Sequence, residues 1–202
     1  YTSLAETYDK RPEYAPKAID HIIETAGLKP GDRFCDIGAG TGKLTCAFLA
    51  RKMVGVSVEP NDAMRNFGAQ NTTGNKCIKW VHATAENTGQ AEHSFSLVSF
   101  GSSFNVVNQE RALKEAARLL VPGGWMACLW NHRQLDDPIQ QKIEGIIKTY
   151  IEIYDYGSRR RDQTKIIKKS RLFDTITKFE HDVTHSIATI DWIKAWRSHA
   201  TL

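Results

Sequence analysis

Short apolar runs of strand length alternate with longer amphipathic stretches along most of the chain. The apolar runs cover residues 33–38, 53–60, 77–83, 95–101 and 125–130. Strands that alternate with helices are typical of βαβ units, in which the strands form a parallel sheet and the helices cover it. This pattern predicts an α/β fold with helices on both faces of the sheet.

The amphipathic stretches carry the start and stop signals of helices. Residues 16–27 have Pro16 in the first turn and end at Gly27, a residue that readily closes a helix. Residues 108–120 begin at Asn108, whose side chain is a good N-cap. Further helices are expected to begin at Lys43 and after Asn61, and to cover residues 138–154 and 190–202.

A glycine-rich turn joins the first predicted strand to the helix that begins at Lys43. Asp36 ends the strand, and Gly38, Gly40 and Gly42 take alternate positions of the turn. Glycines let the backbone approach a ligand closely, and the first N–H groups of the helix have no partner within it. The dinucleotide fingerprint needs glycine at the sixth position, where this chain has Lys43, and the P-loop pattern is absent. The turn therefore indicates a nucleotide-type ligand and disfavours a dehydrogenase.

Two motifs together resemble those of the class I S-adenosylmethionine-dependent methyltransferases. The Asp36-x-Gly-x-Gly-x-Gly turn is similar to motif I of that family. The sequence Leu-Leu-x-Pro-Gly-Gly at 119–124, between a helix and an apolar strand, is a specific feature of the same family. The resemblance implies S-adenosylmethionine as the cofactor.

The amino-terminal segment adds a third point of resemblance. Tyr8-x-x-Arg11-Pro-x-Tyr14 resembles the segment that folds over the cofactor in small-molecule methyltransferases of the methyltransferase-11 or trans-aconitate-methyltransferase-like kind. An ordinary surface arm is an equally weighted alternative for this segment. The resemblance covers residues 1–130 well, and from residue 138 onward it is weak.

The resemblance also implies the full architecture. It predicts a Rossmann-like, doubly wound, mostly parallel seven-stranded sheet with helices on both faces and a helical lid insertion. Residues 175–187, which alternate weakly, are expected to form the closing antiparallel strand or strands. The chain would be one methyltransferase domain, 1–202, made of an amino-terminal cap segment (1–31), a cofactor-binding core (32–130), a lid and acceptor insertion (131–174) and closing strands with a helix (175–202).

Cofactor contacts are expected from the turn and from the ends of the following strands. The residues carried over are Asp36, Gly38, Ala39, Gly40, Glu59, Pro60, Met64, Thr84, Ala85, Glu86, Ser102 and Phe104. Glu59 ends the second apolar run, where a carboxylate can accept hydrogen bonds from both ribose hydroxyls. We expect its replacement by alanine to weaken cofactor binding with little effect on folding. Many relatives have aspartate where Thr84 stands, so the adenine contact there rests on the backbone of Ala85.

Acceptor contacts are expected where the amino-terminal segment meets the end of the last predicted parallel strand. The residues are Tyr8, Arg11, Tyr14, Trp130, Asn131 and Arg133. His132 is the candidate general base for a hydroxyl or amine acceptor, with a purely structural histidine as the alternative. If the acceptor is a carboxylate, no base is needed, and Arg11 and Arg133 would hold it by forked hydrogen bonds.

The expected reaction is methyl transfer from S-adenosylmethionine to a small polar or anionic molecule. An RNA or protein methyltransferase on the same fold and a catalytically silent cofactor-binding subunit are the alternatives. Against nucleic acid, the sequence has no basic stripe interleaved with aromatic residues. No HExxH or Cys/His cluster has the spacing of metal ligands, so no metal is expected.

Composition adds few constraints. The chain has 202 residues and a modest formal net charge of +4, which argues for no particular partner. Its four scattered cysteines favour buried free thiols in a reducing compartment. We see no signal peptide and no apolar run of about 18 residues, so we expect a cytoplasmic protein without a membrane partner. Because it begins at Tyr1, we expect a trimmed or incomplete chain, and its oligomeric state is open.

Overall fold

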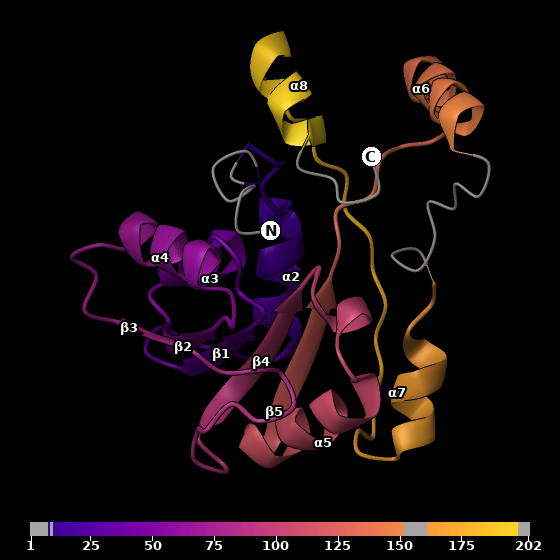
Figure 1. Cartoon of the computed structure of the whole chain (residues 1–202). Coiled ribbons are helices and arrows are strands. Elements are labelled where there is room, and N and C mark those ends of the chain that lie inside the picture. The colour runs from indigo at the N-terminus through magenta and orange to yellow at the C-terminus, as the bar shows by residue number, and fades with distance from the viewer. Residues whose placement is uncertain (1–7, 9, 152–160, 198–202) are drawn as a thin grey trace.

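A parallel β-sheet with helices on both faces forms the centre of the molecule (Figure 1). The computed structural model describes residues 8, 10–151 and 161–197. The strands are β1 (Arg33–Ile37), β2 (Val54–Val58), β3 (Ile78–Val81), β4 (Phe95–Gly101) and β5 (Leu120–Leu129). They are hydrogen-bonded in the order β3-β2-β1-β4-β5, and every neighbouring pair is parallel. The predicted α/β class and parallel sheet are confirmed.

Six of the seven α-helices in the described ranges begin at or next to predicted residues, and α7 was not predicted; the predicted helix residues 152–154 and 198–202 lie outside the described residues. The helices are α2 (Pro16–Thr25), α3 (Lys43–Leu49), α4 (Asp62–Asn71), α5 (Gln109–Leu119), α6 (Pro138–Tyr150), α7 (Thr164–Ser170) and α8 (Thr189–Arg197), with a short 3-10 helix at Phe104–Val106. Asn61 and Asn108 cap α4 and α5 as expected, each accepting a hydrogen bond from a backbone N–H three residues later. Gly27 follows α2 in the left-handed conformation, with φ of 62°.

The predicted number of strands is wrong for the described residues, which form five strands rather than seven. Residues 175–187 were expected to close the sheet with antiparallel pairing, and they form no strand. Their apolar residues Ile176, Phe179 and Val183 recur at intervals of three and four, which does not match the two-residue period of a pleated strand. These residues are instead an irregular connection between α7 and α8 (Figure 1).

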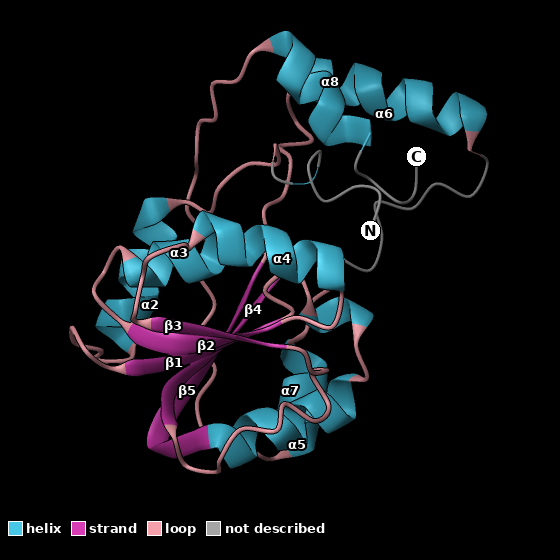
Figure 2. Ribbon diagram, turned by 60° about the vertical axis from the view of Figure 1, so that its left-hand side comes forward, coloured by secondary structure: helices cyan, strands magenta, loops and turns pink. Residues whose placement is uncertain are grey.

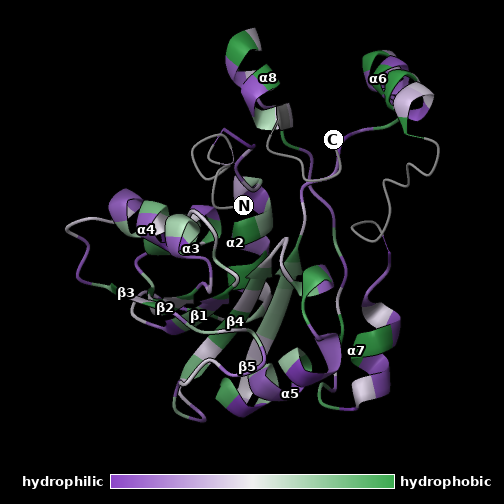
Figure 3. Ribbon diagram, in the orientation of Figure 1, coloured by the Kyte–Doolittle hydropathy of each residue, from purple (hydrophilic) through white to green (hydrophobic). Residues whose placement is uncertain are grey.

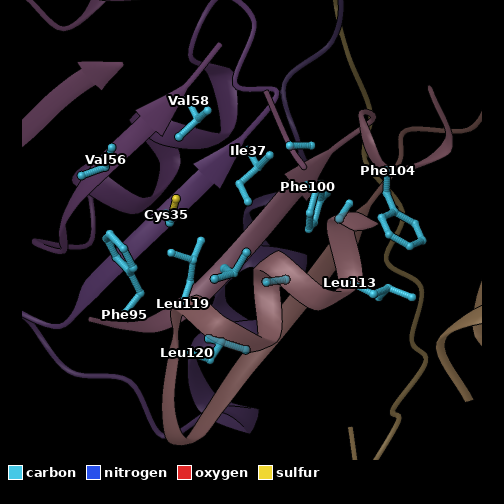
Figure 4. Packing of buried hydrophobic residues seen from close by; sticks show 14 residues of the cluster. Cys35, Ile37, Val56, Val58, Phe95, Phe100, Phe104, Leu113, Leu119 and Leu120 are labelled. Atoms are coloured by element: carbon cyan, nitrogen blue, oxygen red, sulfur yellow. The ribbon is translucent and has the colours of Figure 1, made fainter. Parts of the chain in front are cut away.

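Two hydrophobic clusters, one on each face of the sheet, hold the helices against the strands. On one face α2 and α3 bury Ile19, Leu44 and Phe48 against Phe34 and Leu97 of the sheet. On the other face α5 packs on the sheet, and α7 lies beside α5 (Figure 2). The second cluster is drawn in Figure 4, where side chains of β1, β2 and β4 point toward α5.

The edge strand β5 contains a large irregularity at residues 121–125, where we expected a turn between the helix predicted at 108–120 and the apolar run that begins at residue 125. Leu120 pairs with Phe95 and Trp125 pairs with Leu97, so four residues of β5 lie opposite one residue of β4. Gly123 allows this backbone path, because its φ of 78° is left-handed. The expected turn at 121–125 is therefore a bulge within β5.

The segment between α7 and α8 crosses from one face of the sheet to the other beside β5. Near its start Phe173 packs against the α5 cluster, and further along Phe179 packs against the α2 cluster. The His21 ring of α2 stacks on Phe179 with ring centroids 3.7 Å apart, and its Nδ1 is 3.0 Å from Nε2 of His181. These contacts hold the segment against α2.

Helices α6 and α8 stand beyond the carboxyl ends of the strands (Figure 1). Each buries one apolar residue, Ile147 in α6 and Ala195 in α8. Other large apolar side chains on them are exposed, including Ile146 at 60% and Ile190 at 60%. Figure 3 colours parts of both helices green, as hydrophobic. None of the helices in the described ranges is both long enough and apolar enough to cross a bilayer.

The cysteines are free, but the expectation that they are buried holds only in part. Cys35 is fully buried, Cys46 and Cys128 are half-buried, and Cys77 is exposed. Cys77 precedes β3 rather than lying within it, which explains its exposure. Burial raises the pKa of the Cys35 and Cys128 thiols, so both stay protonated at neutral pH.

Candidate functional site

The order of the strands defines where a ligand would bind. The chain moves from β1 outward through β2 to β3, then returns to the other side of β1 with β4 and β5. The crevice at such a topological switch point, beyond the carboxyl ends of the strands, is the usual ligand site of open α/β sheets. Here it lies between Gly38 after β1 and Ser102 after β4.

The glycine turn has the predicted special geometry. Gly38, Gly40 and Gly42 have φ of 68°, 57° and 86°, values that other residues rarely adopt. The Gly38 and Ala39 N–H groups donate to the carbonyl of Val58, at 2.8 and 3.1 Å. A Cβ on Gly38 would lie 2.5 Å from the Ser103 Cβ, so the turn fits only without a side chain there. The turn is thus fixed between the ends of β2 and β4.

Glu59 lies directly after β2 and beside this turn. Its carboxylate accepts hydrogen bonds from the backbone N–H of Gly40 and of Asn61, each at 2.9 Å, and the residue is 8% exposed. Each carboxylate oxygen has a second lone-pair site, so both can still accept from a ligand. Because Glu59 joins two loops, its loss would also destabilise the fold, contrary to the expectation of little effect.

Asp36 does not face the crevice. It is fully buried, and its carboxylate accepts from Thr45 Oγ1 at 2.7 Å and from Ser99 Oγ at 2.9 Å. Thr45 is in turn 2.7 Å from Ser57 Oγ, so one polar network joins β1, β2, β4 and α3. Burial raises the pKa of Asp36 to about 6, although the two hydroxyl hydrogen bonds lower it. Asp36 therefore supports the turn from below, which corrects the expected cofactor contact.

Other predicted cofactor residues divide into those beside the turn and those in the core. Met64 is buried with its methyl group 3.9 Å from the position of a Cβ on Gly40, while Pro60 is exposed. Phe104 is fully buried and packs edge-to-face on Phe100 at 5.3 Å, as Figure 4 shows. The expected cofactor contact of Phe104 is therefore corrected to core packing.

The loop after β3 is held by a contact between two of its own residues and by a hydrogen bond to the start of α5. Thr84 is exposed and bridges to Asn87, whereas Ala85 is buried against the core. Glu86 accepts from the backbone N–H of Asn108 at 2.8 Å and thereby joins this loop to the start of α5. Only Thr84 of the three presents an exposed side chain.

The amino-terminal segment lies against the glycine turn. A Cβ on Gly40 would be 3.9 Å from the Tyr8 ring, and the guanidinium of Arg11 lies over that ring at 4.1 Å. The Tyr14 hydroxyl is 3.2 Å from Ser102 Oγ, at the end of β4. The structure therefore brings Tyr8, Arg11 and Tyr14 to the switch point.

The end of β5 is tied to the same segment. The Asn131 side chain donates to the carbonyls of Pro12 and Glu13, at 3.2 and 3.0 Å. Trp130 Nε1 donates to Asn105 Oδ1 at 3.0 Å, which holds the loop after β4. Asn131 thus contributes by holding the cap segment in place.

The next two residues, His132 and Arg133, lie on the connection between β5 and α6. His132 is exposed, on the connection to α6. The guanidinium of Arg133 forms an ion pair with Glu144 of α6 and lies over the Trp196 ring of α8 at 4.7 Å. Arg133 therefore joins two helices, and its expected role in holding an acid by a forked contact is corrected.

Several residues at the site escaped the sequence analysis. Ser103 Oγ donates to the Ile37 carbonyl at 2.6 Å, and Lys43 Nζ lies 2.5 Å from Glu13 Oε1, joining the turn to the cap segment. No local pattern distinguishes these residues. Thr41 is different: it stands between two glycines of the turn, and it is 1% exposed with its hydroxyl unpartnered among the described residues. A buried polar group in a predicted ligand loop could have been singled out.

The donors and acceptors fit an adenosylated amino acid. Glu59 offers acceptors, the glycine turn offers a close backbone approach, and Thr41 offers a buried hydroxyl without a partner in the described chain. Residues 35–128 match a family described as a methyltransferase domain. This range contains the glycine turn, Glu59 and the switch point.

Curated relatives are methyltransferases. The chain is 33% identical over 138 residues to an uncharacterised methyltransferase of Mycobacterium tuberculosis, covering 66% of this chain and 52% of the relative. It thus spans about half the length of this relative. It is 27% identical over 216 residues to the ubiquinone/menaquinone biosynthesis C-methyltransferase of Haemophilus ducreyi, covering 89% and 80% of the two chains.

Solved structures share the fold. A proposed S-adenosyl-L-methionine-dependent methyltransferase of Methanococcus maripaludis has a TM-score of 0.61 at 16% identity, over 84% of this chain and 75% of that one. The cyclase SpnF has a TM-score of 0.50 at 19% identity, over 58% and 46%. The glycine turn and the switch-point site thus lie in a region, residues 35–128, that is similar to methyltransferase domains, and the fold is that of solved S-adenosylmethionine-dependent methyltransferases.

Proposed function

We propose that this chain transfers a methyl group from S-adenosylmethionine to a small molecule that carries a polar or anionic oxygen. The observation that carries the proposal is the contact of the cap segment with the glycine turn, where the Tyr8 ring lies 3.9 Å from the Cβ position of Gly40. A cap this close to the glycine turn would restrict the size of the acceptor that can reach the methyl group. It favours a metabolite over RNA or a folded protein.

Under this proposal, Glu59 and the turn hold the cofactor, and the cap segment limits access of water. The sulfonium of the bound cofactor supplies its own activation, so the protein mainly has to align the acceptor with the methyl group. Tyr8 and Tyr14 would form aromatic walls of the acceptor space. Helices α6 and α8, which stand beyond the carboxyl ends of the strands, would act as the lid.

A quinol ring carbon is a second candidate acceptor. The relative from Haemophilus ducreyi is named as a C-methyltransferase of ubiquinone and menaquinone biosynthesis. A quinol carries phenolic oxygens, so it is compatible with the polar oxygen proposed above. The exposed apolar side chains Ile146 and Ile190 on α6 and α8 would suit an acceptor with an apolar tail.

Calorimetry with three ligands tests the cofactor part of the proposal. S-adenosylmethionine and S-adenosylhomocysteine should bind, and NAD should not, because Lys43 takes the place of the third fingerprint glycine. Tight binding of NAD without a signal from S-adenosylhomocysteine would refute the proposal.

Labelled cofactor incubated with metabolite pools, and separately with reduced 1,4-naphthoquinone, tests the acceptor part. Label in a small anionic product supports the first candidate, and label on the naphthoquinol ring supports the second. Replacing His132 by alanine would lower turnover without changing cofactor affinity if His132 is the base. If the label enters only RNA or protein, the small-molecule proposal is wrong.

A further inference from the structure

We infer that the hydroxyl groups of Tyr14 and Ser102 act as one unit that donates a hydrogen bond to an oxyanion of the acceptor and so fixes its position for methyl transfer. This inference rests on the proposed function and names the acceptor class: a phenolate, an enolate or a carboxylate. Tyr14 and Ser102 would be positioning residues, because neither exchanges a proton or an electron pair with the acceptor.

The location of the pair is the first argument. Ser102 follows β4 at the switch point, and its Oγ is 3.2 Å from the Tyr14 hydroxyl. A Cβ on Gly101 would lie 2.7 Å from the same hydroxyl, so the phenol packs directly on the backbone at the strand end. The pair therefore lies between the cap segment and the carboxyl end of the sheet, where cofactor and acceptor would meet.

The backbone of Ser102 is the second, independent argument. Its φ of 58° is left-handed, which is uncommon for a residue with a side chain. The conformation is fixed from both sides: the Ser102 N–H donates to the Leu129 carbonyl at 2.8 Å, and Ser103 Oγ donates to the Ile37 carbonyl at 2.6 Å. Strain of this kind persists when the surroundings over-determine it, and it clusters at functional sites.

Counting protons gives the third argument. Two hydroxyl groups carry two protons, and their mutual hydrogen bond uses one of them. Within the described part of the chain, neither the Tyr14 nor the Ser102 hydroxyl has another hydrogen-bond partner. Whichever hydroxyl donates in the mutual bond, one O–H of the pair is thus available to donate to a ligand.

The protonation state of Tyr14 supports a donor rather than a base. Burial raises the pKa of its phenol, and the nearby groups of Tyr8, Asp36 and Glu13 raise it further, while the Ser102 hydrogen bond lowers it. The phenol therefore keeps its proton at neutral pH. A neutral O–H donor binds an anionic oxygen more strongly than a neutral one, which selects an oxyanion.

The chemical step balances without a proton transfer to the pair. The acceptor arrives as the anion, and an electron pair of its oxygen or of the conjugated carbon forms the new bond to the methyl carbon. The carbon–sulfur bond breaks with its electron pair kept by sulfur, which becomes a neutral thioether. Tyr14 and Ser102 hold the same protons before and after.

The test measures binding of 4-nitrophenol, whose phenolate is coloured, in the presence of S-adenosylhomocysteine at an alkaline pH at which the probe is ionised. Tyr14→Phe and Ser102→Ala should each weaken probe binding about tenfold, the usual size for one charge-assisted hydrogen bond. The double variant should lose no more than either single one, because the two hydroxyls act together. Affinity for S-adenosylhomocysteine should stay unchanged.

Two further variants keep the result interpretable. Tyr150→Phe removes a phenol that is 85% exposed on α6 and should leave probe binding unchanged. Ser102→Gly removes the hydroxyl and permits φ of 58°, so it should raise the melting temperature while still weakening probe binding.

Four outcomes would overturn the inference. Tyr14→Phe could bind the probe as tightly as Tyr150→Phe, or the losses of the two single variants could add fully in the double variant. Wild-type protein that binds S-adenosylhomocysteine but not 4-nitrophenol would refute the inference and leave the proposed function standing. Failure to bind S-adenosylhomocysteine would refute the proposed function, and the inference with it.

Discussion

The sheet with its glycine turn and the appended helices α6 and α8 are built in opposite ways. Around the turn, Asp36, Glu59 and Ser103 each bond to neighbouring elements, and the core beneath them is fully buried. In the appended helices, large apolar side chains are exposed; Arg133 contacts both helices, and Lys10 pairs with Asp191 of α8 at 3.7 Å. The region around the glycine turn is therefore fixed by many buried contacts, whereas few contacts among the described residues hold α6 and α8.

The largest expected effect comes from Gly38→Ala. The new Cβ would meet Ser103 at 2.5 Å, and φ of 68° would strain the backbone. We expect the free energy of unfolding to fall by about 2–4 kcal/mol, from the overpacking and the strain together. Urea denaturation followed by circular dichroism measures it.

Gly74→Ala is the matched control, since Gly74 has φ of 80° with nothing within 4 Å of a new Cβ. It should cost about 1–2 kcal/mol from the backbone alone. Equal losses in the two variants would mean that the contact with Ser103 does not hold the turn. The conclusion that buried contacts fix the region around the glycine turn would then be wrong.

The second-largest effect is expected from the ionisation of Asp36, which makes the free energy of unfolding depend on pH. Its pKa is raised by burial from the ordinary value of 3.8 to about 6, so the folded protein holds this proton more tightly than the unfolded chain. Between about pH 4 and 6 the stability contributed by this group is therefore lost as pH rises, by up to about 3 kcal/mol. Asp36→Asn cannot ionise and should lack this slope. Denaturation of both proteins at several pH values tests it, and a pH-independent difference between them would contradict the assignment.

The third-largest effect is expected for Glu59→Ala. It leaves the N–H groups of Gly40 and Asn61 without their acceptor, which should lower the free energy of unfolding by about 1–3 kcal/mol. Affinity for S-adenosylhomocysteine should fall as well, which calorimetry measures. Glu110→Ala, an exposed change on α5, is the control and should alter neither quantity. A loss of affinity without a loss of stability would support the original expectation, in which Glu59 binds the cofactor and contributes little to folding.

The smallest effect on global stability is expected for Glu144→Gln in α6. Removing the charge paired with Arg133 should change the free energy of unfolding by less than about 1 kcal/mol, because only α6 and α8 would loosen. Hydrogen exchange should become faster in these two helices and stay unchanged in the sheet. Faster exchange throughout the sheet would show that the two regions are not independent.

Much of the fold could be predicted because local patterns and packing agree. The glycines at 38–42, the caps at Asn61 and Asn108 and the five parallel strands all follow from spacing and capping chemistry that tertiary contacts then reinforce. The prediction of strands at 175–187 was wrong, because the apolar residues there do not have the two-residue spacing of a strand. The position of this segment depends instead on packing against α2.

The side-chain partners at the site could not be predicted in the same way. Motif position alone placed Asp36 and Phe104 beside the cofactor, yet both side chains point into the core. Arg133 was predicted at an acceptor, and Glu144, eleven residues further along, pairs with it. Which way a side chain points depends on partners distant in sequence, and no local pattern encodes them.

The irregular segment that crosses beside β5 also bears on self-association. β5 pairs with β4 on one side, and an uncovered edge strand would offer its backbone groups to the edge of another molecule. Phe179 and His181 anchor the segment on α2, so it stays next to that edge without forming a strand. We expect a protease cut within residues 180–187 to free part of this segment and to make edge-to-edge association through β5 more frequent, which light scattering would measure.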